Sequence, residues 1–185
     1  WRSPDNTVGG TSAGSGNVIS GNSWAGVEIG RAGATDNRVQ GNYIGTDRTG
    51  SAFLGNEGDG VHIWRAPYNT IGGMTRETRN VISGNEVGIG IFDEGANANG
   101  VLGNYVGTDV YGVPSIPNRF GVWIGNAANT RVKGNLIAGN NYDGVQISKT
   151  DADVLTGGNT ITENSIHSNG LMGINLGEDE VTQND

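Results

Sequence analysis

Side chains suited to binding a sugar lie in or just after a recurring Gly-[Val/Ile]-x-[Ile/Leu] motif. Aromatic rings offer apolar faces on which sugar C–H groups stack, and neighbouring carboxylates bind hydroxyl groups. The residues of this candidate patch are His62, Trp64, Phe92, Asp93, Glu94 and Trp123. We expect them to form a glycan-binding surface. The alternative is that long loops or a neighbouring subunit cover the rings.

The same stretch contains groups that suggest catalysis. Asp93, Glu94 and Glu28 would supply the two carboxylates of a glycoside hydrolase, where one acts as acid and the other as base or nucleophile. His62 beside Arg65 would suit proton abstraction. Acidic residues of an acidic protein are usually only solvated, and no partner motif accompanies the histidine. We therefore predict no catalytic residue and favour a binding or structural protein over an enzyme.

Two Gly-Thr-Asp strings, ending at Asp47 and Asp109, raise the question of a metal. Loop oxygens with these carboxylates would suit calcium, which makes the two residues weak calcium candidates. The simpler interpretation is turn capping, in which each carboxylate accepts backbone N–H groups. The chain contains no cysteine, so disulfides and thiolate metal sites are excluded. No other cofactor is predicted.

The composition limits the classes of partner that the protein could bind. The net charge is −8, and Lys133 and Lys149 are the only lysines, so a nucleic-acid groove is excluded. No apolar run approaches the ~18 residues of a membrane span. The chain begins at Trp1 with no signal peptide, so we interpret it as a mature or excised segment. We expect an extracellular or cell-surface location.

The elements that position these residues repeat along the chain. An apolar position recurs at intervals of 31, 32, 30, 31 and 29 residues, at Val8, Val39, Ile71, Val101, Val132 and Ile161. Asn-x-[Ile/Val] and the glycine motif recur alongside it. Within motifs such as Val61-His62-Ile63 the aliphatics alternate with polar residues, as in a strand with one buried face. The pattern predicts an all-β, right-handed parallel β-helix of about six coils, each with three short strands.

The corners carry asparagine. Because it lies two positions before an inward aliphatic, its side chain should face inward and hydrogen-bond to the next coil. The predicted structural ladder is Asn17, Asn42, Asn80, Asn104, Asn135 and Asn164. Gly-Asn pairs such as Gly41-Asn42 precede these strands, and we expect both residues of the pair to supply left-handed geometry at the bend.

A longer period groups the coils in pairs. Asn69 to Gly73 repeats Asn6 to Gly10, and Gly103 to Asp109 repeats Gly41 to Asp47. We predict one domain over residues 1–185, built from repeats at approximately 6–68, 69–128 and 129–185. Long loops at 48–58 and 110–119 should fold back onto an apolar outward column of the second strand series. If they do not, that column is a lateral assembly surface.

The strings "NVISGN", "GNYIGTD" and "NTIGG" resemble the Asn/Gly-rich parallel β-helix repeats of the pectate-lyase-like superfamily, in a subclass found in large secreted bacterial surface proteins. The resemblance covers almost the whole chain and implies the fold. It does not imply one function, because the same scaffold carries lyases, hydrolases, epimerases, adhesins and passive stalks. No catalytic cluster of the lyases is matched here.

Two functions follow as expectations. The first is an extracellular structural β-solenoid unit, such as a stalk, surface-layer or filament element, whose partner is a further copy of itself or further β-helix repeats. The basis is that neither terminus shows an amphipathic helix to cap the open coils. The second is a carbohydrate-binding or polysaccharide-degrading protein, whose partner is a polysaccharide.

Overall fold

The computed structural model describes residues 3–149 and 156–177, which form three parallel sheets of six strands each. Sheet A contains β1 (Thr7–Gly9), β4 (Arg38–Gln40), β7 (Thr70–Gly72), β10 (Gly100–Leu102), β13 (Arg131–Lys133) and β16 (Thr160–Thr162). Sheet B contains β2 (Val18–Ile19), β5 (Tyr43–Ile44), β8 (Val81–Ile82), β11 (Tyr105–Val106), β14 (Leu136–Ala138) and β17 (Ser165–His167). Sheet C contains β3 (Val27–Gly30), β6 (Val61–Trp64), β9 (Val87–Phe92), β12 (Phe120–Gly125), β15 (Val145–Ser148) and β18 (Ile174–Asn175).

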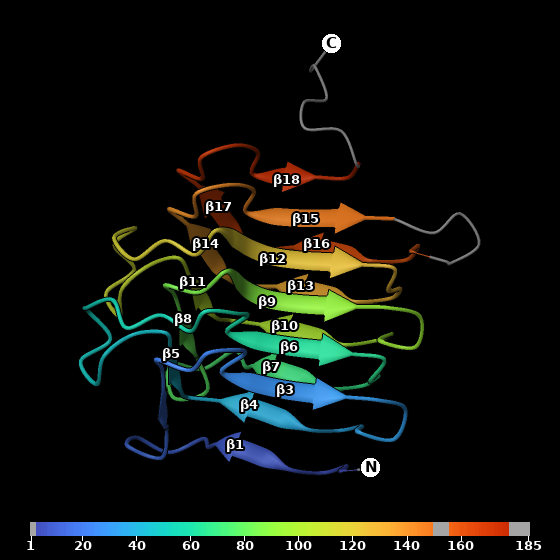
Figure 1. The fold of residues 1–185 in the computed structure, drawn as a ribbon, viewed down its shortest axis with the longest axis horizontal. Helices are drawn as coiled ribbons and strands as arrows, with labels where there is room; N and C mark the ends of the chain where they lie inside the picture. Colours follow the sequence, from blue (N-terminus) through green and yellow to red (C-terminus); the bar gives the residue numbers. More distant parts are fainter. Residues whose placement is uncertain (1–2, 150–155, 178–185) are drawn as a thin grey trace.

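Each strand pairs with the strands one coil before and one coil after it. In sheet A, Val8 pairs with Val39, and Val101 pairs with both Ile71 and Val132. In Figure 1 the coils rise from the N-terminus, the strands of sheet C run to the right in front, and those of sheet A run to the left behind them. This sense of rotation is right-handed. The predicted parallel β-helix is therefore confirmed.

Columns of aliphatic side chains fill the interior. Strand residues alternate between the two faces of a sheet, so every second side chain points inward. Val61 and Ile63 of β6 are fully buried, whereas His62 between them is partly exposed on the outer face. Ile82 and Val106 continue the buried column in sheet B. Among the described residues no helix occurs, and none could therefore span a membrane.

Three ladders of asparagine amides line the corners, each linking successive coils. In the predicted ladder, Nδ2 of Asn42 donates to Oδ1 of Asn80 at 3.1 Å, and Nδ2 of Asn80 donates to Asn104 at 2.9 Å. A second ladder joins sheets B and C through Asn22, Asn56, Asn85, Asn118, Asn140 and Asn169. A third precedes sheet A through Asn6, Asn37, Asn69, Asn99 and Asn159, with Thr130 in place of one asparagine.

The Gly-Asn bends differ from the prediction in one respect. Gly41 has a φ of 73° and Gly103 a φ of 63°, so these glycines adopt left-handed geometry. The asparagine after each does not, and the expectation that both residues supply left-handed geometry is wrong. The physical reason is the ladder: Asn42 keeps its side chain inward only with the strand-like backbone that starts β5. Gly16 does not adopt positive φ either.

The two long loops fold back over the outer face of sheet B, as expected. A Cβ added at Gly50 would lie 3.3 Å from the Tyr43 ring, and one at Gly112 would lie 3.0 Å from Leu136. Val81 is 2% exposed, although it points outward from β8. The cover is incomplete, because Val18 in β2 remains 48% exposed.

Candidate functional site

A row of aromatic rings crosses the outer face of sheet C from coil to coil. Successive ring centroids lie 5.0–6.1 Å apart, within the usual range for interacting aromatic pairs. The members of this aromatic row are Trp24, His62, Phe92, Trp123, Phe120 and Tyr142. Five coils contribute to it, so the row runs along the axis of the solenoid.

The pleat of sheet C explains why these rings meet. His62 pairs in register with Gly90, and Gly90 pairs with Trp123. Because glycine has no side chain, Phe92 lies over that position, and a Cβ added to Gly90 would come 2.3 Å from its ring. Phe92 thus fills the gap between His62 and Trp123, at 5.5 Å from each ring. Gly90 is required for a continuous row.

A carboxylate fixes the imidazole in this row. Oδ2 of Asp59 lies 2.7 Å from Nδ1 of His62, and the two side chains are only 12% and 18% exposed. A carboxylate on Nδ1 favours a proton on that nitrogen, which leaves Nε2 of neutral imidazole as the acceptor. Asp59 lies one residue before the motif that begins at Gly60. The pair provides an oriented polar group among the rings.

Trp64 lies beside the row within a cluster of charged groups. Its indole Nε1 donates to Oδ2 of Asp93, and the guanidinium of Arg65 lies 4.8 Å from its ring centroid. Nε of Arg65 also lies 3.3 Å from Asp93 Oδ2, and Arg31 lies 5.8 Å from the indole. The guanidinium groups occupy part of the ring surface. Trp64 therefore offers a ligand less free aromatic area than Trp24, which is 61% exposed.

Arg119 lies over the rings at the other end of the aromatic row. The guanidinium of Arg119 lies 4.9 Å from the Tyr142 ring centroid and 5.5 Å from that of Phe120. Arg119 Nη1 also donates to Oε1 of Glu86. This hydrogen bond to Glu86 raises the pKa of Arg119 above its ordinary value. The surface around the row therefore carries both signs of charge, which suits hydroxyl-rich ligands better than a polyanion.

Of the predicted patch, the structure brings His62, Phe92 and Trp123 into one row and places Trp64 and Asp93 beside them. Glu94 is exposed and has no hydrogen bond or ion pair within the described part of the chain. Sequence reasoning missed Trp24, Phe120, Tyr142 and Asp59. All four precede a glycine of the Gly-x-x-[Ile] motif by one or two positions. Their position close before a motif glycine was the available signal.

The two Gly-Thr-Asp strings form capped turns. Oδ1 of Asp47 accepts the N–H groups of Ser51 and Ala52, both at 3.1 Å, and Thr49 donates its hydroxyl. Oδ1 of Asp109 accepts the N–H groups of Tyr111 and Val113, both at 2.9 Å. The described residues contain no cluster of three or more His, Cys, Asp or Glu side chains.

Fold and surface together define the class: the chain is a parallel β-helix repeat protein. A model of the family described as a protein of unknown function (DUF1565), a parallel β-helix-type family, matches residues 105–185. The match covers somewhat under half of the chain, so it is a similarity of the C-terminal coils. No curated protein and no solved structure matches the chain.

Proposed function

We propose that the protein binds a neutral or weakly charged glycan along the aromatic row of sheet C. The observation that carries this proposal is the continuity of six rings, with centroids spaced 5.0–6.1 Å apart, over five successive coils. Isolated exposed aromatics are common on protein surfaces, whereas an aligned row offers one stacking surface to several units of a linear chain.

Polar groups beside the rings would fix the register of that glycan. The His62–Asp59 pair and the Arg119–Glu86 pair lie at different heights along the row. Each can hydrogen-bond a sugar hydroxyl, while the rings contact the C–H faces. An extracellular or cell-surface location fits such a ligand. Cleavage is not part of the proposal.

The test is a titration with neutral polysaccharides, namely β-glucan, xylan, mannan and galactan, followed by tryptophan fluorescence and calorimetry. Trp24→Ala and Tyr142→Ala change exposed rings at the two ends and should leave the fold intact. We expect each to weaken binding about tenfold, equivalent to about 1.4 kcal/mol. Tyr111→Ala is the matched control, since Tyr111 is 80% exposed on a loop over sheet B. Unchanged fluorescence with every glycan contradicts the proposal.

A second candidate function, end-to-end stacking as a structural element, is favoured by the polarity of the ladders. In every ladder an amide of one coil donates to Oδ1 of the next coil towards the C-terminus, as Asn17 donates to Asn42. In the first described coil, Oδ1 of Asn6, Asn17 and Asn22 accepts from no described residue. In the last described coil, the backbone N–H groups of Asn159, Asn164 and Asn169 donate to no described residue. A further coil, from a second copy or from continuing chain, would satisfy both sets.

Electron microscopy and light scattering at several concentrations test this second candidate. Stacking predicts rods much longer than one six-coil unit. Ile174→Glu, which places a charge on the 45% exposed core position of β18, should shorten them. Val18→Glu on the outer face of sheet B is the control for added charge. A monodisperse monomer whose first and last coils are both protected from hydrogen exchange would rule stacking out.

A further inference from the structure

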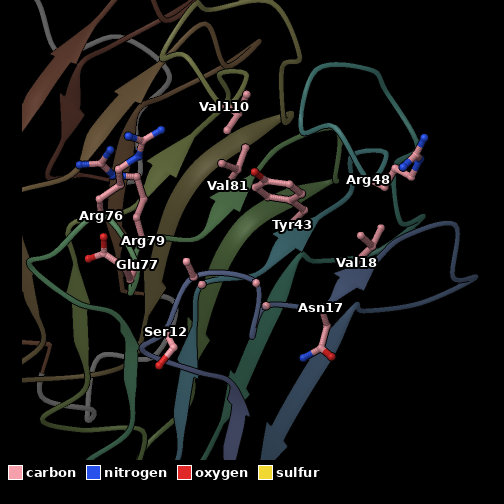
Figure 2. A pocket seen from close by; sticks show the side chains of 14 residues that line it. Ser12, Asn17, Val18, Tyr43, Arg48, Arg76, Glu77, Arg79, Val81 and Val110 are labelled. Atoms are coloured by element: carbon pink, nitrogen blue, oxygen red, sulfur yellow. The ribbon is translucent and has the colours of Figure 1, made fainter.

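A hollow, away from the aromatic row, lies on the outer face of sheet B. Its volume is about 490 Å³, within the range of small-molecule sites. Val18, Tyr43 and Val81, from three successive coils, form an apolar floor, and Val110 from a long loop lies above it (Figure 2). The chain between β1 and β2 forms one wall. The hollow exists because the two long loops cover sheet B incompletely.

The charge around this hollow is opposite to that of the whole protein. Arg48, Arg76 and Arg79 line it, and Glu77 is the single acidic residue that does so. The lining therefore carries three positive charges and one negative, a formal +2, in a chain whose net charge is −8. Figure 2 shows Arg76 and Arg79 together on one side of Tyr43, and Arg48 on the other side. Three of the eleven Lys and Arg residues thus surround one small hollow.

The arginines differ in how they are held. Nε of Arg79 donates to the carbonyl of Gly103 at 3.2 Å, and its guanidinium lies 4.1 Å from the Tyr105 ring centroid. Arg79 is thereby fixed in place. Arg48 and Arg76 are exposed and make no ion pair or hydrogen bond with any residue that the structure describes. Their donors are therefore available to a ligand.

We propose that this hollow binds a phosphate group, as the free ion or as the monoester of a small sugar. A phosphate monoester carries about −1.5 to −2 charge at neutral pH, which matches the formal +2 of the lining. Guanidinium groups hold phosphate oxygens through paired N–H donors. The Tyr43 ring and the exposed Val18 side chain would contact the sugar. The site is on a different sheet from the aromatic row, so it does not depend on the proposed glycan site.

The first experiment follows backbone amides and arginine Nε–H groups by NMR during titration with inorganic phosphate and with a hexose 6-phosphate. We expect saturable shifts at residues 12–17, at Tyr43 and at Arg79, and none along the aromatic row. A tighter dissociation constant for the hexose phosphate would assign the monoester as the ligand, and equal constants would assign the free ion. Affinity should fall as sodium chloride rises. Shifts that never saturate, or that spread over the whole surface, overturn the proposal.

Paired variants separate a site from a general charge effect. Arg48→Gln with Arg76→Gln should weaken phosphate binding at least about tenfold, because the two unpaired positive charges that line the hollow are lost. Arg38→Gln with Arg131→Gln removes the same charge from exposed positions of sheet A and should change affinity by less than about twofold. Glu77→Gln should tighten binding. Equal losses in the two double variants would refute the site, and stronger binding of a hexuronate than of the hexose phosphate would refute its ligand class.

Discussion

The interior corner ladders and the outer aromatic row use the repeat in opposite ways. Each ladder places the same residue, asparagine, at the same corner of nearly every coil, and in the predicted ladder each Nδ2 donates to Oδ1 of the next coil. The aromatic row places a different residue on each coil, including His62, Phe92 and Trp123, and draws others from loops. Uniformity is what a stacked backbone requires at its corners. A surface that recognises a ligand of defined shape needs different side chains at different positions.

Removal of one asparagine from the middle of a ladder should destabilise the protein most. Asn104→Ala would remove the Oδ1 that accepts from the backbone N–H and Nδ2 of Asn80, and the Nδ2 that donates to Asn135 Oδ1 and to the carbonyl of Ile71, in a fully buried corner. Each unsatisfied buried group costs about 1–3 kcal/mol, so the total should be on the order of 5 kcal/mol. Urea denaturation measures it. Asn141→Ala, at an exposed asparagine, is the control, and a similar loss in both would remove the special status of the ladder.

Next in size is the aliphatic column beside the ladder. Ile82 is fully buried in β8, and Ile82→Ala should cost about 3 kcal/mol, within the usual 2–5 kcal/mol for such a cavity. The same denaturation experiment applies. A loss below about 1 kcal/mol would mean that neighbouring coils close the cavity, and that the interior is more adaptable than its uniform columns suggest.

One substitution in the third ladder should stabilise the protein. Thr130 replaces asparagine in the third ladder, and its buried hydroxyl oxygen has no hydrogen-bond partner. Thr130→Asn should restore the missing link between Asn99 and Asn159 and stabilise the protein by about 0.5–1.5 kcal/mol. Thermal unfolding would show it as a higher Tm. A lower Tm would show that this corner has adapted its shape to threonine.

The smallest effect concerns an exposed turn. The hydroxyl of Thr49 and the amides around it hold the pKa of Asp47 below its ordinary value. A lowered folded-state pKa stabilises the protein above the unfolded pKa, and this contribution is lost as pH falls through the folded value. Asp47→Asn should therefore lower the Tm slightly at pH 7, and the difference should vanish at strongly acid pH. A Tm difference that stays constant with pH would exclude the carboxylate charge as its cause.

Much of the fold was predictable because the strand motifs are local and strictly spaced. The ladder through Asn42 and Asn80 followed from alternation alone, since each asparagine directly precedes a strand. The second ladder did not follow, because its asparagines lie in loops three or four residues before the glycine motif, where strand alternation fixes no side-chain direction. The third ladder could have been predicted in the same way as the first, since Asn37, Asn69 and Asn99 each directly precede a strand of sheet A.

The candidate sites were predictable only in part for the same reason. His62 and Trp123 lie within strands, so their outward direction followed from the pleat. Trp24 and Tyr142 lie in the loops before sheet C, where no periodicity fixes the direction of a side chain. The arginines around the sheet B hollow come from positions 48, 76 and 79, and only the folded loops bring them together.

Pairing only between adjacent coils also determines how the molecule would respond to force. Since each strand bonds to one strand above and one below, a pull at one end loads a single coil at a time. Single-molecule extension should show a series of similar rupture steps. Each would release a coil of about 30 residues, or about 100 Å of chain at ~3.4 Å per residue. The solenoid would act as a stepwise extensible tether.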